Sequence, residues 1–203
     1  MSTLLILGAG GHGRVVADAA LASGQWTRVI ASGRNPAPAA DELLPGVPIV
    51  RWEEALGTAG AVHVAIGDAA AREREVSLLR EGMLAAVVHP RASMSVHAKV
   101  SSGCFVGAQA VVGPCAWLGV AVIVNHGAVV DHDVEVGDFA HIAPLVALGG
   151  AVRIGRRVML GSGASVLPGR RIADGIVVGS GAVVIDDLTE AGVYAGVPAR
   201  RVK

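Results

Sequence analysis

Residues 106–153 read VGAQAV VGPCAW LGVAVI VNHGAV VDHDVE VGDFAH IAPLVA LGGAVR, in blocks of six that each begin with Val, Leu or Ile. The period continues in both directions, so that every sixth residue from Val88 to Val184 is apolar. A period of six fits neither the 3.6 residues of a helical turn nor the alternation of an ordinary strand. It is typical of a hexapeptide β-helix, in which three short strands form one triangular coil, and about five such coils are expected here.

The composition of each block supports this interpretation. Gly often stands second, as at Gly107 and Gly161, where it permits a positive φ or a close approach of two chain segments. The fifth residue is usually Ala or Val, so each block is expected to point one large and one small side chain inward. Cys104 holds this fifth position and is expected to be a small buried thiol. With Cys115 as the only other cysteine, no disulfide framework is expected.

Residues 1–88 are organised differently, because strand and helix patterns alternate there. Gly24 and Asp68 are expected to end one helix and to cap another. Segment 32–48 is rich in Pro, Gly and Asn and is expected to be loop. The alternation predicts a small α/β, Rossmann-like domain with a parallel sheet, followed after His89-Pro90 by a β-helix domain over 89–203. The expected strands are 4–7, 28–31, 61–66 and 85–88, and the expected helices are 14–23, 52–56 and 69–80.

Charge and composition argue against several kinds of partner. The 203 residues include 17 basic and 17 acidic side chains with no basic block, which argues against nucleic acid or an acidic membrane. The stretch between Lys99 and Asp131 is uncharged, but Gln109, Pro114 and Asn125 lie in it and the period of six persists, so a β-helix interior explains it better than a membrane span. The N-terminus lacks the basic region of a secretory signal. We therefore expect a cytoplasmic protein without membrane insertion.

Gly8-Ala-Gly-Gly-His-Gly13 matches G-x-G-x-x-G between an expected strand and an expected helix, which is the setting of a phosphate cradle. A nicotinamide dinucleotide site would need an acidic residue about 20 residues further on. The segment Ala31-Ser-Gly-Arg-Asn35 contains none, which disfavours NAD. Another phosphorylated ligand is favoured over a purely structural turn, and His12 could touch it.

A polar cluster occupies the outward positions of the β-helix around residues 125–141. His126 and His132 hold the same position in adjacent blocks, so they are expected on different faces, which argues against a shared zinc ion. Acid–base catalysis is favoured over surface decoration, because the pKa of histidine lies near neutrality. Either Asp131 or Asp133 could hold the second ring nitrogen of His132.

These features together resemble the bacterial sugar O- and N-acetyltransferases of the sialic-acid O-acetyltransferase type, over essentially the full length. The resemblance implies a left-handed parallel β-helix and a homotrimer with active sites between neighbouring β-helices. It further implies acetyl-CoA in the groove between two of them, and an N-terminal domain that binds the nucleotide of a nucleotide-linked amino sugar. The motifs that carry it are 8–13, Ala-Ile-Gly-Asp (65–68), His89-Pro90, Val-Asp-His-Asp (130–133), Gly-Asp-Phe-Ala-His-Ile-Ala-Pro (137–144) and Ala-Gly-Val-Pro-Ala-Arg (195–200).

The resemblance also implies residue roles. His132 matches the general base, and Asp133 matches the carboxylate that orients it. Direct attack on the thioester needs neither a metal nor an acyl-enzyme. Two departures from the family are the absence of its paired acidic residues at 31–35 and the replacement of its usual Asn-Thr by Asn125-His126. The remaining matches are Asn125 and His141 at the acetyl and sugar site, with His141 also grouped with the cofactor; Gly150, Ser162 and Ser180, whose backbone meets the CoA arm; and Gly10, Gly11, His12, Gly13, Gly67 and Asp68 in the nucleotide pocket.

The leading hypothesis is therefore N-acetylation of an amino group on a nucleotide-linked sugar. Acetylation of a hydroxyl on a sugar, on sialic acid or on a small metabolite remains an alternative. A non-catalytic or zinc-dependent β-helix protein is another, because the hexapeptide period alone specifies a fold and not an activity.

Overall fold

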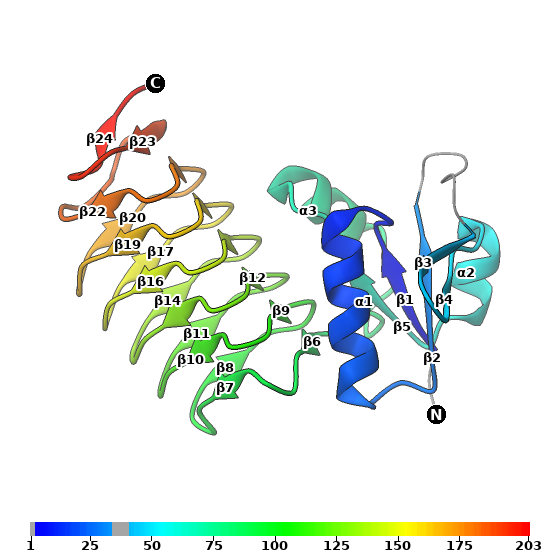
Figure 1. Cartoon of the computed structure of the whole chain (residues 1–203). Helices are drawn as coiled ribbons and strands as arrows, with labels where there is room; N and C mark the ends of the chain where they lie inside the picture. The colour runs from blue at the N-terminus through cyan, green and yellow to red at the C-terminus, as the bar shows by residue number, and fades with distance from the viewer. Residues whose placement is uncertain (1–2, 34–40) are drawn as a thin grey trace. The chain divides into compact units, whose positions relative to one another are not determined.

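The computed structural model describes residues 3–33 and 41–203, and the chain divides into two compact units, Met1–Pro90 and Arg91–Lys203 (Figure 1). The expectations about Arg34 and Asn35 fall outside the described residues. Within the described ranges, no helix is both long enough and apolar enough to cross a membrane.

The first unit is built on a parallel sheet in the order β2-β1-β5. Its central strand carries the buried apolar run 4–7 and lies between two neighbours, with Leu5 in register with Ile30 and Val62. Burial on both faces explains why this strand is a continuous apolar run instead of an alternating one. The expected small α/β domain is confirmed. Its strands are β1 (Thr3–Leu7), β2 (Arg28–Ser32) and β5 (Ala61–Val64), and its helices are α1 (Gly11–Ser23), α2 (Trp52–Thr58) and α3 (Ala69–Ser77).

The expected helix boundaries at Gly24 and Asp68 are confirmed, whereas α2 ends two residues later and α3 three residues earlier than expected. Gly24 follows α1 with φ 64°, a left-handed conformation that glycine adopts without strain. Asp68 caps α3, because its Oδ1 accepts a hydrogen bond of 2.7 Å from the Ala71 amide. Helix α1 starts at Gly11, inside the glycine motif and three residues earlier than expected, so the motif itself forms the first helical turn.

Segment 32–48 was expected to be loop, and this is wrong for its second half. Strands β3 (Glu42–Leu44) and β4 (Val47–Pro48) form an antiparallel hairpin, with Gly46 at φ 82° between them. Buried Leu43 and Val47 anchor the hairpin, and the surrounding Pro and Gly residues concealed this short apolar pair in the sequence. The fourth expected strand is also shorter than 85–88, because only β6 (Val87–Val88) is regular.

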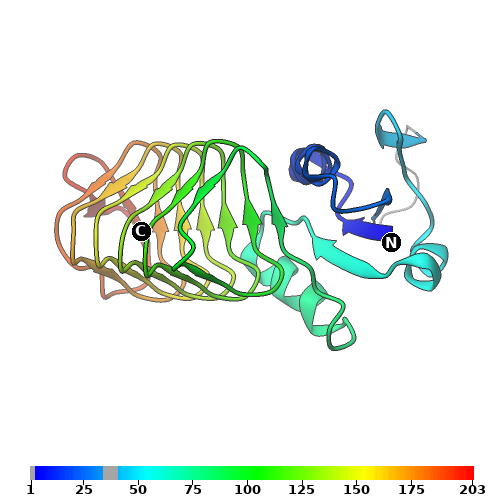
Figure 2. The ribbon, with the colours of Figure 1, turned by 90° about the horizontal axis from the view of Figure 1, so that it is seen from below.

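The second unit is a left-handed parallel β-helix with three faces, as expected. Figure 2 shows its coils stacked in succession from green to red. Residues 18 apart pair in register, as Val112 does with Val130 and Val124 with Ile142. Face 1 carries β7 (Ser93–Met94), β10 (Val111–Val112), β13 (Val129–Val130), β16 (Ala147–Leu148), β19 (Ser165–Val166) and β22 (Val183–Val184). Face 2 carries β8 (Lys99–Val100), β11 (Trp117–Leu118), β14 (Glu135–Val136), β17 (Arg153–Ile154) and β20 (Arg171–Ile172). Face 3 carries β9 (Phe105–Val106), β12 (Ile123–Val124), β15 (His141–Ile142), β18 (Met159–Leu160) and β21 (Val177–Val178), beyond which lie β23 (Val193–Ala195) and β24 (Arg200–Arg201).

The interior of the β-helix is the stack that the period of six predicts. The first residues of successive blocks on one face are completely buried, and so are the small fifth residues beside them. Cys104 belongs to this second set, and its Sγ lies 3.0 Å from the Gly119 carbonyl oxygen. The first set on face 3 is Val106, Val124, Ile142, Leu160 and Val178.

The turns between faces have one repeated conformation. The fourth residue of the block is left-handed even where it is not glycine, as at Cys115 (φ 61°) and Asp133 (φ 58°). The second-position glycines are explained by close approach and not by a positive φ. A Cβ on Gly113, for example, would lie 2.8 Å from the backbone nitrogen of His132 on the next coil. We call the turns that follow face 1 strands corner 1/2 and those that follow face 3 strands corner 3/1.

The outward residues differ sharply between faces. Each strand contributes one outward side chain, because its second residue points into the coil. The outward row of face 1 has no charge, whereas that of face 2 is mostly charged. The face 1 row is Ser93, Val111, Val129, Ala147, Ser165 and Val183, and the face 2 row is Lys99, Trp117, Glu135, Arg153 and Arg171.

Candidate active site

His132 lies at corner 1/2, in the turn between β13 and β14, and both neighbouring carboxylates contact it. Its Nδ1 lies 2.8 Å from Asp133 Oδ2, while its backbone amide donates a 2.7 Å hydrogen bond to Asp131 Oδ1. Of the two candidate partners, Asp133 therefore holds the ring and Asp131 holds the backbone. Both side chains of the His132–Asp133 pair are more than half exposed, so a ligand can reach them.

The pair has the electrostatics of a general base. The hydrogen bond that His132 donates to Asp133 raises the pKa of His132, and the charge of Asp131 raises it further. With the Nδ1 proton directed at Asp133, the neutral ring presents the lone pair of Nε2 to a ligand. A carboxylate at Nδ1 also stabilises the imidazolium that forms once Nε2 has taken a proton.

The ring of His132 lies against Gly150, the equivalent residue one coil further on. A Cβ on Gly150 would overlap Nε2 and would lie 2.5 Å from Cε1. The absence of a side chain at Gly150 therefore leaves the space that the imidazole ring of His132 occupies. The Gly150 backbone is consequently next to the nitrogen that would do the chemistry.

The same turn offers a hydrogen-bond donor that the fold does not use. Where Asn or Asp stands second in the block, its side-chain oxygen can accept a hydrogen bond from the backbone amide of the third residue. Asn125 Oδ1 accepts such a bond of 2.9 Å from the His126 amide. Gly149 stands second before Gly150, and among the described residues the Gly150 amide has no acceptor. At corner 1/2, the third position before His132 is Pro114 and the one after Gly150 is Pro168, and neither proline has an N–H.

Ser162 and Ser180 have the same arrangement at corner 3/1. Each follows a glycine, and in the part of the chain that the structure describes neither amide donates a hydrogen bond. The three residues matched to the CoA arm thus all present a free backbone donor. They do not lie together, however, because Gly150 belongs to corner 1/2.

Asn125 and His141 also lie on the corner 3/1 side of the β-helix. Asn125 Nδ2 and His141 Nε2 are 3.4 Å apart, and His126 is exposed beside them. Face 1 separates this group from His132. A single chain therefore has two half-sites, one with the base and one with the amide and imidazole groups. Over the described residues, no three His, Cys, Asp or Glu side chains are grouped to hold a metal ion.

The glycine motif of the first unit divides into structural and open positions. A Cβ on Gly13 would overlap the Gly8 carbonyl oxygen, and one on Gly8 would lie 2.6 Å from the Ala65 oxygen, so these two residues bring the loop against segment 65–68. Gly13 is buried, and its place in the nucleotide pocket stays a prediction. Gly10, Gly11 and Gly67 are exposed with nothing within 4 Å of a Cβ, and they leave room for a ligand.

The first turn of α1 suits an anion. No side chain caps its N-terminus at Gly10, and its leading backbone amides point out of the helix. His12 lies within this first turn, and exposed Asp68 begins α3 beyond the adjoining loop. The geometry of the glycine loop permits a phosphate-bearing ligand, and its binding there stays a prediction.

The buried side chain of Arg72 stabilises the loop at 65–68, and the sequence pattern did not single it out. Arg72 is completely buried, and its Nη1 donates to the carbonyl oxygens of Ile66 at 2.7 Å and Gly67 at 2.9 Å. An arginine in a charged helix resembles a solvated residue in sequence. Burial lowers the pKa of nearby His63 to about 4, so its ring stays neutral where Nδ1 meets the Ala85 oxygen at 2.9 Å.

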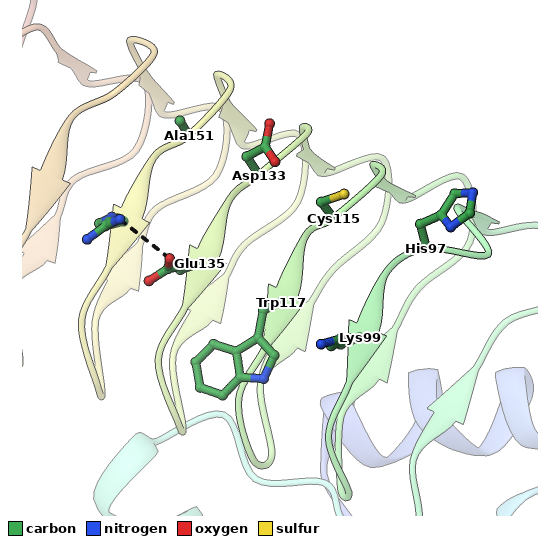
Figure 3. A pocket seen from close by; sticks show the side chains of 8 residues that line it. His97, Lys99, Cys115, Trp117, Asp133, Glu135 and Ala151 are labelled. Carbon is green, nitrogen blue, oxygen red and sulfur yellow. Dashed lines mark ion pairs between the residues drawn. The ribbon is translucent and has the colours of Figure 1, made fainter.

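A groove of about 620 Å³ runs along face 2 beside the base, and sequence reasoning missed it (Figure 3). Its walls are outward residues of face 2 together with fourth residues of corner 1/2. Since these come from successive coils 18 residues apart, only the stacking of coils brings them together. The lining residues are His97, Lys99, Cys115, Trp117, Asp133, Glu135, Ala151 and Arg153.

Comparison with known proteins identifies relatives over the whole chain. Residues 3–79 match the PglD N-terminal domain model. No curated protein sequence matches the chain. A mutant of GDP-perosamine N-acetyl transferase from Caulobacter crescentus, solved with CoA and GDP-perosamine, is 34% identical with a TM-score of 0.91, covering 99% of this chain and 97% of that one.

Two further structures give the same result. PerB from Caulobacter crescentus, also with CoA and GDP-perosamine, has a TM-score of 0.87 at 34% identity, with 99% and 97% of the two chains covered. The acetyltransferase domain of PglB from Neisseria gonorrhoeae FA1090, in complex with acetyl coenzyme A, has a TM-score of 0.89 at 32% identity, with 98% of each chain covered. The chain belongs to the sugar N-acetyltransferase family that these structures represent.

Proposed function

We propose that this protein transfers the acetyl group of acetyl-CoA to the amino group of a nucleotide-linked amino sugar, with His132 as general base. The observation that carries the proposal is the His132–Asp133 pair beside the unused Gly150 amide. A nucleotide-linked amino acceptor is favoured because relatives at 34% identity were solved with CoA and GDP-perosamine. The open glycine loop at the start of α1 supplies a place for the diphosphate.

The chemistry follows from these groups. The amine nitrogen attacks the thioester carbonyl while Nε2 of His132 accepts a proton from that nitrogen. The Gly150 amide donates to the oxygen that becomes negative in the tetrahedral intermediate. The C–S bond then breaks, and the proton on Nε2 passes to the departing CoA sulfur. Asp133 keeps the ring oriented and stabilises its charged form between these two transfers.

A homotrimer would join the two half-sites. The outward row of face 1 has no charge and is flanked by the two functional corners, and Val111 in it is 36% exposed. If three copies turn face 1 toward a common axis, corner 3/1 of each copy meets corner 1/2 of the next. Asn125, His141, Ser162 and Ser180 of one subunit then line the site that contains His132 and Gly150 of its neighbour. The CoA arm runs between them along the free amides.

The first test is turnover. CoA release from acetyl-CoA is measured against UDP-, GDP- and dTDP-linked 4-amino sugars, for the native protein and for His132→Ala. Loss of a general base is expected to lower kcat on the active sugar by about 10²–10⁴-fold, with an unchanged circular dichroism spectrum. Turnover that survives the substitution would remove His132 from the mechanism. No CoA release with any sugar of the panel would contradict the proposed acceptor.

The dependence of kcat/KM on pH tests the role of the His132–Asp133 pair. Only neutral His132 can accept a proton, so kcat/KM should fall as pH drops through its raised pKa. Asp133→Asn removes the main cause of that raised pKa, so the acidic limb should move to lower pH, and Asp131→Asn should move it less. The substrate amine titrates identically with all three proteins, so a displacement between them reports on the enzyme. Superimposable limbs would show that His132 is not the titrating base.

Gly150→Ala tests the close contact with the imidazole. The added methyl group would overlap the ring at Nε2, so the ring must leave its position, and a displacement of about 1 Å can lower kcat on the order of 10²-fold. Gly57→Ala in α2, where a Cβ meets nothing within 4 Å, is the matched control and should retain full activity. Equal kcat for the two variants would mean that the ring position in the structure is not the working one.

The oligomer is tested by placing a charge on face 1. The native protein should have three times the 20.4 kDa mass of one chain by light scattering. Val129→Arg should dissociate it and abolish turnover, because each site needs two subunits. Val202→Arg, at a position 60% exposed near the C-terminus, should change neither property. A monomeric native protein with full turnover would refute the shared site.

A further inference from the structure

We propose that Arg72 is a positioning residue, which holds the loop at 65–68 so that two backbone N–H groups of that loop face the nucleotide of the acetyl acceptor. This inference rests on the proposed function in one respect, that a nucleotide binds beside the glycine loop of the first unit. Arg72 does not touch the ligand itself, because its side chain is completely buried. Its influence on binding passes through the loop that it contacts.

The loop at 65–68 lies beside the glycine loop at one edge of the sheet. Strands β1 and β5 are parallel neighbours, with Leu7 in register with Val64, so the segments that follow them leave the sheet at the same edge. These two segments approach closely, because a Cβ on Gly8 would lie 2.6 Å from the Ala65 carbonyl oxygen. Ligands of open parallel sheets bind outside the carboxyl ends of the strands, so both loops border the expected nucleotide site.

The guanidinium of Arg72 fixes the direction of two successive peptide groups. Its Nη1 donates hydrogen bonds of 2.7 Å to the Ile66 oxygen and of 2.9 Å to the Gly67 oxygen. Both carbonyl groups therefore point toward the buried guanidinium. Both peptide groups are trans, and in a trans group the N–H points opposite to the C=O. The amides of Gly67 and Asp68 consequently point away from Arg72.

These two amides are donors that the fold leaves unused. In the part of the chain that the structure describes, neither the Gly67 nor the Asp68 amide donates a hydrogen bond, whereas the preceding Ala65 amide donates to the Leu7 oxygen at 2.8 Å. Gly67 and Asp68 are exposed, and a Cβ on Gly67 would meet nothing within 4 Å. Two outward N–H groups in an open place suit the acceptor atoms of a bound nucleotide.

The burial of Arg72 supports a role beyond packing. A buried guanidinium loses its hydration and is tolerated where protein acceptors replace the lost water. An apolar side chain in its place would avoid that loss, but it would leave the Ile66 and Gly67 oxygens without this donor and the two peptide groups unfixed. The planar fork of arginine also holds its hydrogen bonds in a more rigid geometry than a lysine ammonium does. The direction of the loop amides therefore depends on this side chain.

The role of Arg72 is tested by the affinity of the full chain for free nucleotides. Isothermal titration calorimetry with GDP, UDP and dTDP identifies the nucleotide that the native protein binds most tightly. Arg72→Met removes both hydrogen bonds and should raise Kd for that nucleotide about tenfold or more, a factor equivalent to about 1.4 kcal/mol. Arg72→Lys keeps the charge but not the fork, so its Kd should lie between the native and Arg72→Met values.

Two controls separate positioning from a general loss of stability. Val62→Ala removes methyl groups from the core of the same unit, so it should lower the thermal unfolding midpoint, as Arg72→Met should, but change the nucleotide Kd less than about twofold. In turnover assays at saturating sugar nucleotide, Arg72→Met should raise KM for the sugar nucleotide while kcat and KM for acetyl-CoA stay within about twofold. A merely structural effect would not produce this split.

A second pair of variants tests the loop amides without altering Arg72. Asp68 has φ −66°, the value at which proline is fixed, so Asp68→Pro removes the N–H and keeps the backbone conformation. Asp68→Ala is the matched control, because both variants lose the side chain that caps α3 and only the proline variant loses the N–H. Asp68→Pro should bind the nucleotide at least about fivefold more weakly than Asp68→Ala.

The outcomes distinguish this role from acetyl transfer. An unchanged nucleotide Kd in Arg72→Met, or equal Kd values for the two Asp68 variants, would overturn the positioning role and leave the acetyltransferase activity in place. If Arg72→Met does not fold, an unchanged Kd in Arg72→Lys would overturn it instead. Nucleotide binding that depends on Arg72 in a protein without turnover on the sugar panel would refute acetyl transfer alone. A native protein that binds none of the three nucleotides would overturn the positioning role.

Discussion

Each coil of the β-helix must return to the same face after 18 residues, so that every strand pairs in register with the strand one coil away. The buried stack and the repeated turns of the second unit depend on this constraint. The apolar residue of each block stacks on its counterpart one coil away, as Val124 does on Ile142. Because the interior repeats, the turns repeat as well, with the fourth residue left-handed at one corner after another. A side chain placed on a turn is therefore held by two neighbouring coils, a rigidity that catalytic groups require.

His132, the proposed base, illustrates how functional groups can be placed on a repeat. At residues 131–133, Asp-His-Asp occupies the second to fourth positions of its block, the first of which is glycine in many other blocks. Asp131 accepts a hydrogen bond from the backbone amide of His132. Asp133 adopts the left-handed conformation of the fourth position, and the side chain of His132 projects outward. One coil away, Gly150 supplies both the space for the ring and a backbone N–H beside Nε2. The site therefore depends on a glycine as much as on the histidine it accommodates.

Local pattern was enough for the fold and for choosing His132 and Asp133 as candidate catalytic residues, but not for contacts between coils. The period of six predicts the β-helix and its buried stack, and the polar residues that depart from it point to His132 and Asp133. No local pattern states that Gly150 lies under the imidazole or that Asp133, not Asp131, holds Nδ1. The groove was missed for the same reason, since Trp117 and Glu135 become neighbours only when coils stack. In the first unit, buried Arg72 and the β3–β4 hairpin likewise depend on tertiary packing.

Stability and specificity are thus assigned to different positions of the same block. The first and fifth residues point inward, where removing a Leu or Ile side chain costs about 2–5 kcal/mol, so these positions are fixed by packing. The outward residues contact ligands or solvent, and changing them leaves the interior stack intact. Backbone amides at the turns suit a cofactor arm that is common to many acetyltransferases, because they do not depend on side-chain identity. Outward side chains can distinguish one ligand from another, because they differ from block to block.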